Sequence, residues 1–553
     1  MKKVWNKSLI SVGLLAIFLL ILSACSSDGS TSEKESEKGG DPGKGEEVQE
    51  STTPVTGGKI SIGLNAEPDT LDMHKTGMAL ASIVGSNLGA ALLAVDPETQ
   101  DIKPHMAESY EVSEDGKTLT FKLHSGITFH DGTALTAQAY KDTFDRAMNP
   151  DTGAVVAGSL LSDVQEVTAQ DELTLVIELK KPSAPFLVFL ASGGYLQPLS
   201  MAAIEQHGEN YGKNPVGVGP WKFNKWETGQ SILLSKNEAY KWPQYYYENR
   251  ESPYPDELEF KFITDYQTKL AALDTGSIDI ALYVEAKDIQ RYRDNDKFEV
   301  KELERQGLGL LMEMNTENEK LQDPNIRKAL NMAIDKSILV QAILAGEGTV
   351  VDGPLSSNFF GYDPEVENYG YKYNQDEAIK LLESSGWSKN GKGIMEKNGK
   401  ELSLELLTTA ATNQQAQIIQ AMTKEIGISI EIQSMESATL IEKAGNGEFD
   451  LAFLSYAYSD PDILLLLFHS SQGALNHTRA NNPELDALLE QGRTEMDLEK
   501  RKELYIAAQK IIVKEAYWVP IYTEKVFHVI NKRVHGVKNS ATDLLFHDSW
   551  VEQ

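Results

Sequence analysis

The sequence contains few of the residues that usually cross-link or activate a protein. It has one cysteine among 553 residues, so no disulfide can form within the chain and the fold must depend on its hydrophobic core. The motifs G-x-S-x-G, H-E-x-x-H and G-x-x-x-x-G-K-[ST] are all missing. These absences disfavour an enzyme that relies on a thiol, an activated serine, zinc or a phosphate-binding loop.

A basic excess is also missing. The chain carries 52 Lys and Arg against 82 Asp and Glu, which gives a formal net charge of −30. Proteins that bind nucleic acids show the opposite balance, so we expect no nucleic-acid partner. The acidity favours solubility and keeps the chain off anionic surfaces. No feature of the sequence calls for a cofactor.

One long apolar run stands near the N-terminus, at residues 9–22, after Lys2, Lys3 and Lys7. Its length of roughly 14 residues is short for a membrane-spanning helix, which needs about 20. It ends in Leu-Ser-Ala-Cys, which resembles a bacterial lipobox, and the cysteine is Cys25. We therefore predict a signal peptide over residues 1–24 and a lipid on Cys25. The alternative is an ordinary signal peptide followed by a chance cysteine.

Residues 25–57 are rich in Ser, Thr, Gly, Lys and Glu and contain no aromatic residue. Such a segment buries too little apolar surface to offset the entropy of the chain, so it predicts a disordered tether. The acidic chain has no charge-based attraction to a membrane, and the lipid must hold it there. We expect a protein anchored at the extracytoplasmic face of the cell membrane and acting as a monomer.

The folded part begins with mixed strand and helix patterns. Apolar and polar residues alternate over 118–123 after an Asp-Gly turn at Asp115 and Gly116, which predicts a hairpin strand. Residues 124–133 predict a second strand and a second Asp-Gly turn, at Asp131 and Gly132, before a helix capped by Thr136. Later, residues 308–315 form an apolar run with Glu313 inside it.

The second half alternates between strand and helix. Strands near 402–408, 428–432 and 449–454 enclose helices at 414–425 and 439–446, and this order predicts a mostly parallel sheet. Two closing strands are predicted, at 518–522 and 526–530. Asp323 with Pro324, and Asn374 with Glu377, have the composition of helix starts.

Five phrases of the sequence together resemble one family. Residues 107–148 resemble the hallmark segment of the family 5 extracytoplasmic solute-binding proteins, the peptide and nickel receptors of ABC importers. Four more phrases follow in the family's order: residues 65–72, 215–223 with Gly217 and Gly219 permitting close backbone approach, 276–281 and 325–336. The sequence departs from the family at His124, Met73 and Trp221, where the family has a basic residue, proline and tyrosine.

The resemblance implies an α/β fold of the type II periplasmic-binding-protein kind, with two lobes and an extra domain inserted in the N-terminal half. We place the first lobe at residues 58–92, 212–307 and 520–553, the inserted domain at 93–211 and the second lobe at 308–519. The implied function is capture of a solute between the lobes by hinge closure and its delivery to an ABC permease in the membrane. No catalytic residue and no bound metal are expected.

The loop after the predicted strand 449–454 is the best candidate site, because ligands of open α/β sheets lie at the carboxyl ends of strands. We predict that Trp221, Tyr456 and Tyr458 line the cleft. Asp460 or Asp462 would meet a cationic group of the ligand and Arg479 an anionic one, these six residues forming the predicted site. The alternative is a solvated loop in which Asp460 caps the following helix. A dedicated metal site at His469 and His477 is disfavoured.

The ligand is less well defined than the family. Peptide receptors have an aspartate where this chain has Ala457, dipeptide receptors have an arginine where it has residues 408–413, and nickel receptors have a tyrosine where it has Ser459. A longer peptide held through its backbone needs none of these groups. We therefore predict an oligopeptide ligand, with nickel or another metal chelate as the second choice and a secreted hydrolase as the least favoured reading.

Overall fold

We describe a computed structural model of the chain, at residues 53–97, 99, 101–191, 194–305, 307–357, 359–540 and 544–552. The predicted signal peptide, Cys25 and most of the tether lie outside these residues. Within these ranges, no helix combines the length and the apolar character that a membrane crossing requires.

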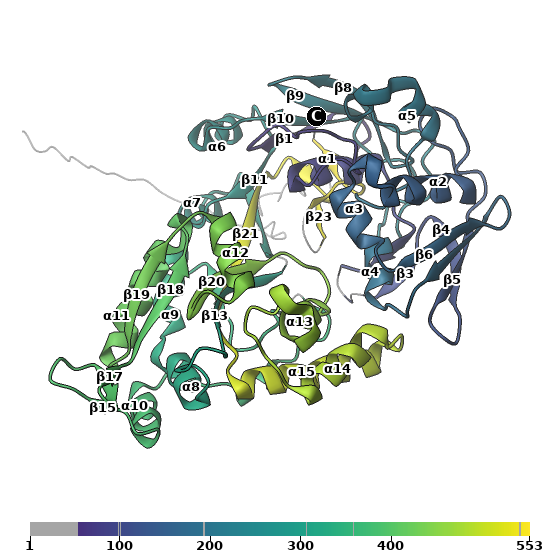
Figure 1. The fold of residues 1–553 in the computed structure, drawn as a ribbon. Coiled ribbons are helices and arrows are strands. Elements are labelled where there is room, and N and C mark those ends of the chain that lie inside the picture. Colours follow the sequence, from purple (N-terminus) through teal and green to yellow (C-terminus); the bar gives the residue numbers. More distant parts are fainter. Residues whose placement is uncertain are drawn as a thin grey trace, which may run out of the picture. The chain divides into compact units, whose positions relative to one another are not determined.

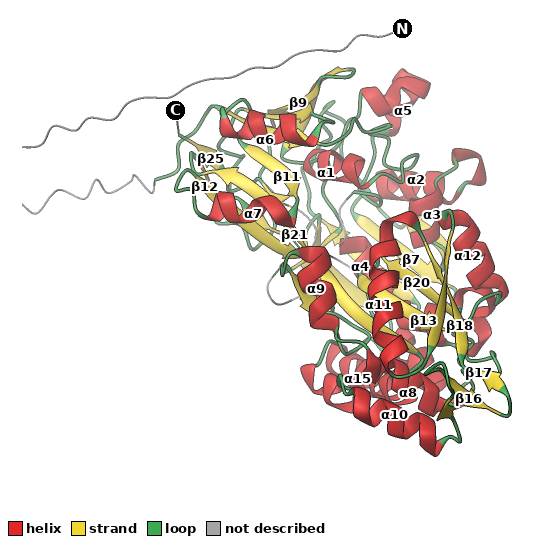
Figure 2. Ribbon diagram, turned by 90° about the vertical axis from the view of Figure 1, so that its left-hand side faces the viewer, coloured by secondary structure: helices red, strands yellow, loops and turns green. Residues whose placement is uncertain are grey.

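The largest sheet has 12 strands and extends from β19 to β8 (Figures 1 and 2). Its order is β19-β18-β20-β13-β21-β11-β1-β10-β9-β8, and β12 and β14 also pair with β21. The strands are β1 (Lys59–Leu64), β8 (Trp221–Glu227), β9 (Ser231–Lys236), β10 (Glu257–Phe262), β11 (Ile280–Val284), β12 (Phe298–Glu304), β13 (Leu308–Met314), β14 (Gly348–Val350), β18 (Ser403–Thr408), β19 (Ser429–Ser434), β20 (Leu451–Tyr456) and β21 (Trp518–Asn531).

The strand character predicted for residues 518–522 and 526–530 is confirmed, but the break between them is wrong, because both belong to β21, one strand of 14 residues. The polar residues Thr523, Glu524 and Lys525 look like a break in the sequence. In the structure Thr523 and Glu524 pair with β14, and Lys525 pairs with β12, so the ladder continues through them. One end of β21 pairs with β13 and the other with β11, and the strand therefore joins the two halves of the sheet.

The predicted parallel sheet of the second half is confirmed. β18 lies between β19 and β20 and is parallel to both. The helices α11 (Asn413–Glu425) and α12 (Ser437–Asn446) make the two crossover connections. After β18 the chain forms β19 on one side of it and then β20 on the other side. The direction of winding therefore changes between β18 and β20.

A separate antiparallel sheet of four strands, β4-β5-β7-β6, belongs to the N-terminal half. The hairpin at Gly116 and the cap at Thr136 are confirmed, with a φ of 68° at the glycine. The second strand predicted within 124–133 is wrong, because Gly126 adopts a positive φ and only a single bridge forms, at Thr128. The second Asp-Gly turn is confirmed, with a φ of 88° at Gly132. The strands are β4 (Ala107–Val112), β5 (Thr118–Leu123), β6 (Val164–Ala169) and β7 (Thr174–Leu179).

Helices and short strand pairs surround these sheets. Asp323 caps α8 and Asn374 caps α10, as predicted, and both side chains accept a backbone N–H. The helices are α1 (Ala79–Leu88), α2 (Ala137–Met148), α3 (Val155–Leu160), α4 (Pro185–Ala191), α5 (Met201–His207), α6 (Tyr266–Asp274), α7 (Ala286–Arg293), α8 (Pro324–Ala333), α9 (Lys336–Leu344), α10 (Gln375–Ser384), α13 (Ile463–Phe468), α14 (Pro483–Thr494) and α15 (Leu498–Glu515). The short strands are β2 (Leu93–Val95), β3 (Ile102–Pro104), β15 (Ser388–Lys389), β16 (Met395–Lys397), β17 (Lys400–Glu401), β22 (Val534–His535), β23 (Lys538–Asn539), β24 (Leu544–Leu545) and β25 (Trp550–Val551).

Separate hydrophobic clusters fill the body. One cluster gathers buried residues between Ala90 and Val218 around the four-stranded sheet. Others lie against the first part of the large sheet and against its β18–β20 part. Close backbone approach at Gly217 and Gly219 is confirmed, since a Cβ there would stand 2.0 Å and 2.5 Å from backbone oxygens. The domain boundaries given above stay a prediction.

Candidate ligand-binding site

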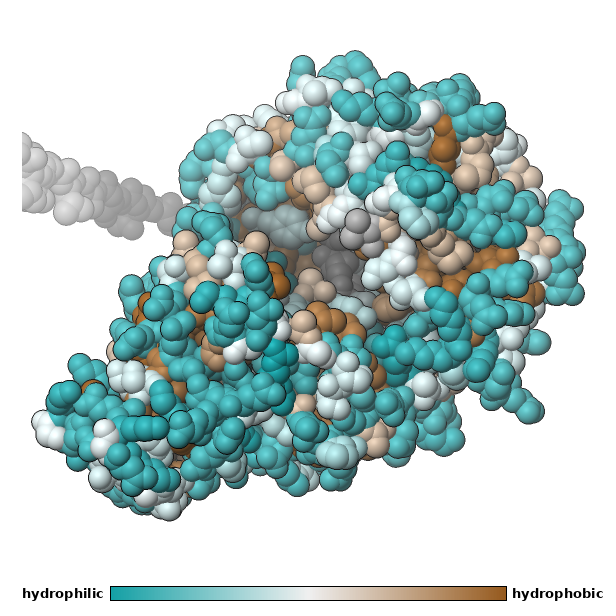
Figure 3. All heavy atoms as spheres, viewed as in Figure 1, coloured by the Kyte–Doolittle hydropathy of each residue, from teal (hydrophilic) through white to brown (hydrophobic). Residues whose placement is uncertain are grey.

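The change of winding between β18 and β20 is where an open α/β sheet usually holds its ligand. β18 ends at Thr408 and β20 ends at Tyr456. Ala410, Ser455 and Ala457, which lie at or just beyond these ends, are exposed. Figure 3 shows the molecular surface hollowed beside α13, with apolar side chains gathered there. These exposed residues at the ends of β18 and β20 are small and uncharged.

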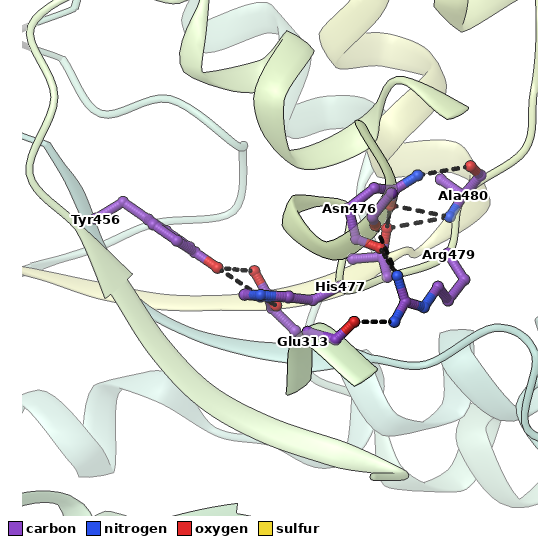
Figure 4. A network of polar contacts seen from close by, with 9 residues as sticks. Glu313, Tyr456, Asn476, His477, Arg479 and Ala480 are labelled. Atoms are coloured by element: carbon purple, nitrogen blue, oxygen red, sulfur yellow. Dashed lines mark hydrogen bonds and ion pairs between the residues drawn. The ribbon is translucent and has the colours of Figure 1, made fainter. Parts of the chain in front are cut away.

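Tyr456 turns away from this edge into a buried polar cluster (Figure 4). Its hydroxyl donates to Glu313 Oε1 at 2.7 Å, and His477 Nδ1 lies 3.0 Å from Glu313 Oε2 and 3.0 Å from the same hydroxyl. Burial, and next to it the charge of Glu313, raises the pKa of Tyr456. The cluster fixes Tyr456 and thereby sets the backbone that presents Ser455 and Ala457.

Gly307 packs against the same backbone, at Tyr456 and Ala457. It has a φ of 108°, and a Cβ at this position would stand 2.1 Å from the carbonyl oxygen of Tyr456. A side chain here would therefore push the site loop out of place. Glycine is the residue that fits both the conformation and the space.

The two aspartates of the loop are bound to arginines of the protein itself. Both oxygens of Asp460 accept from Arg501, at 2.9 Å and 2.6 Å, and both side chains are buried. Asp462 lies 3.3 Å from Arg493, and burial raises the pKa of Asp462 to about 6. Asp460 also accepts the N–H of Asp462 just before α13, which is close to the capping role considered above.

The structure places the other predicted residues in different surroundings. Trp221 is fully buried in the hydrophobic cluster around β1, and Tyr458 is partly buried with its ring edge-on to Phe189. Arg479 has a φ of 55° and donates to the carbonyl oxygens of Gly445 and Gly473. One loop thus contains Tyr458, Asp460 and Asp462, directly after Tyr456 at the end of β20. Trp221 lies in the hydrophobic cluster around β1. Their contact with a ligand stays a prediction.

Among the described residues, no group of three or more His, Cys, Asp and Glu side chains has the arrangement of a metal site. His469 contacts Glu490 and His477 contacts Glu313, so the two histidines belong to separate pairs.

The loop between β1 and α1 is held by hydrogen bonds to other parts of the chain. Glu67 accepts from Trp226 Nε1 at 2.7 Å and from the N–H of Gly229 at 3.0 Å. Asp72 accepts two hydrogen bonds from Arg146 of α2, at 3.0 Å and 2.6 Å. These bonds tie the loop after β1 to β8 and to the inserted part of the chain.

Comparisons with known proteins agree with this architecture. Residues 101–476 match the model of the bacterial extracellular solute-binding proteins, family 5. The chain belongs to this family. Its members are substrate-binding receptors of ABC importers rather than enzymes.

Relatives of this family 5 receptor match most of its length. It is 27% identical to the oligopeptide-binding protein AppA of Bacillus subtilis, over 98% of each chain. It is 29% identical to heme-binding protein A of Haemophilus influenzae, over 80% of this chain and 82% of that one. These proteins are similar to this one and have different ligands in their names.

Solved structures share its fold. HbpA2 of Haemophilus parasuis superposes with a TM-score of 0.81 at 24% identity, over 90% of this chain and 100% of that one. AppA in complex with a nonapeptide gives a TM-score of 0.68 at 25% identity, over 91% of this chain and 100% of that one. The predicted fold class of two α/β lobes with an inserted domain is confirmed.

Sequence reasoning missed the arginines of this family 5 receptor that bind the loop. Arg501 lies 41 positions from Asp460, and Glu313 lies 164 positions from His477. One signal was present in the sequence, since an acidic residue inside an apolar run needs a polar partner. The identity of that partner depends on the fold.

Proposed function

We propose that this chain is a lipid-anchored receptor that captures an oligopeptide between its two lobes and delivers it to an ABC permease. The main support is the correspondence with AppA over 98% of both chains, together with the nonapeptide in the AppA structure. The exposed small residues at the ends of β18 and β20 fit a ligand that is held by its backbone. Hinge closure about β21, the strand that the two halves of the large sheet share, would trap the ligand.

A metal chelate is the second candidate ligand. The name of heme-binding protein A favours it, because heme is an iron chelate. A secreted hydrolase remains the least favoured function, since the family consists of receptors. We further propose that the receptor acts as a monomer.

Calorimetric titration separates the ligand classes. We expect a pool of nonapeptides to bind at one site with a Kd of about 1 μM or lower. Hemin and a nickel–histidine chelate should release no saturable heat. Mass spectrometry after incubation should recover the peptides uncut. Tight binding of either chelate without peptide binding would overturn the peptide proposal, and cleaved peptides would overturn the receptor proposal.

The lipid anchor can be tested separately from the ligand. Cys25→Ala should move the protein from the membrane fraction to the soluble fraction, because the acidic body offers no electrostatic substitute for the lipid. Ser27→Ala is the matched control in the same segment and should stay with the membranes. Immunoblotting of cell fractions measures both. A Cys25→Ala protein that remains in the membrane fraction would contradict the anchor.

A further inference from the structure

The inserted part of the chain contacts the β18–β20 half directly, through residues that lie outside β21. Arg493, near the end of α14, donates to Asp163 at 2.9 Å across 330 positions. The carbonyl oxygen of Arg493 accepts the N–H of Ala184 at 2.9 Å. Met496 packs against the hydrophobic cluster around the four-stranded sheet. This set of contacts joins two parts that have separate hydrophobic clusters.

The same contact set reaches the candidate ligand loop. Arg493 also faces Asp462 at 3.3 Å, so one guanidinium stands between carboxylates of both parts. Tyr458, four residues before Asp462, meets Phe189 of α4 with ring centroids 6.4 Å apart and planes at 87°. The loop that presents Ala457 to the site therefore also supplies Tyr458, which contacts the inserted part, and Asp462, which pairs with Arg493.

The character of these contacts suits an interface that opens and closes. The side chains of Asp163 and Arg493 are each 18% exposed, so the pair keeps some contact with water even while the ion pair is formed. Ion pairs of this kind contribute modestly and leave a hinge free to move. Interfaces between domains of one chain are usually polar for the same reason.

We propose that Arg493 is an interdomain latch, which holds the inserted domain against the ligand loop in the closed receptor and releases it on opening. Opening about the shared strand has to separate Asp163 from Arg493, while Asp462 keeps its arginine. A ligand that contacts the loop at Ala457 or Tyr458 would favour the latched form, because it binds that form better than the open one. This proposal rests on the hinge closure of the proposed function.

The test replaces the carboxylate of Asp163, on the inserted side, so that Arg493 keeps its pairing with Asp462. Asp163→Asn should lower the closed-to-open ratio of the ligand-free protein about fivefold, because it removes the charge that Arg493 binds. Asp163→Glu should restore most of that ratio. Glu166→Gln is the matched control, since it removes an equal charge from an exposed position on β6.

The readout is the distance between the two parts. Dyes on Gln138→Cys and Glu503→Cys, in a Cys25→Ser background, report it by single-molecule energy transfer, and small-angle scattering reports the radius of gyration. A longer distance and a larger radius in Asp163→Asn alone would support the latch. Equal distances in Asp163→Asn, Glu166→Gln and the parent protein would overturn it.

Failure of the latch and failure of the peptide proposal give different results. The distance measurement uses ligand-free protein, so it does not depend on what the receptor binds. Adding a nonapeptide pool then tests coupling, and we expect its dissociation rate to rise several-fold in Asp163→Asn. If Asp163→Asn is more open but no peptide binds, the latch proposal is supported and the proposal of a peptide ligand is contradicted.

Discussion

Arg501→Met should cost about 3–5 kcal/mol of stability, because it leaves the carboxylate of Asp460 buried without its partner. Arg501 is 2% exposed and Asp460 is 1% exposed on their side chains, so water cannot replace the lost hydrogen bonds. Arg501 Nε also donates to the carbonyl oxygen of Gly492 at 2.9 Å, and methionine gives up that bond as well. The measurement is the urea midpoint of unfolding, followed by fluorescence.

Two further variants make the Arg501 result specific. Lys502→Met removes a charge from an exposed position of the same helix and should change stability by less than about 0.5 kcal/mol. Arg501→Met combined with Asp460→Leu removes both charges and should recover a large part of the loss. A loss below about 1 kcal/mol in Arg501→Met alone would mean that the ion pair does not hold the loop.

Acidification from pH 6.5 to pH 4 should destabilise the fold strongly. Burial lowers the pKa of five histidines to about 4: His74, His105, His130, His528 and His547. Between these two pH values the unfolded chain binds a proton at each histidine and the folded chain does not, so folding loses stability as the pH falls. Each histidine contributes about 3 kcal/mol by pH 4.

One buried acid works against this trend. The pKa of Asp462 is raised to about 6, so the folded protein binds its proton first and gains stability between pH 6 and the ordinary range of an aspartate. Five histidines outweigh one aspartate, and near pH 5 the net dependence is about 5 kcal/mol per pH unit. Urea midpoints at pH 7, 6 and 5 measure it.

A variant identifies the histidines as the source of the acid sensitivity. His105 donates through Nε2 to the carbonyl oxygen of Trp242 at 3.0 Å, and glutamine offers a similar donor without a titratable group. His105→Gln should therefore reduce the proton uptake on unfolding at pH 5 by about one. An unchanged uptake, or a wild-type midpoint that does not move between pH 7 and pH 5, would contradict the assignment.

Local signals in the sequence predicted local structure well. The caps at Asp323 and Asn374 and the turn at Gly116 depend on residues next to one another, and the structure contains all three. The five phrases led to the family and its fold. The second strand failed because Gly126, which has a positive φ, interrupts it. The closing strands merged because distant partners pair with their polar middle.

The candidate site was harder to predict because its groups meet only after folding. The loop from Tyr456 to Asp462 was found from its place after a strand, which is a rule about sheets. The partners of its aspartates come from α14 and α15, and nothing near Asp460 in the sequence indicates them. A pair of acids in a loop looks the same whether it awaits a ligand or already has an arginine.

The shared strand β21 also determines when the protein can finish folding. It lies between β13 and β11, so both halves of the sheet keep an unpaired edge until residues 518–531 have been synthesised and have joined them. Unpaired edges pair readily with other chains and cause aggregation. A fold built in this way depends on prompt pairing of β21 or on a chaperone, and the loss of residues 518–531 would leave both halves incomplete at once.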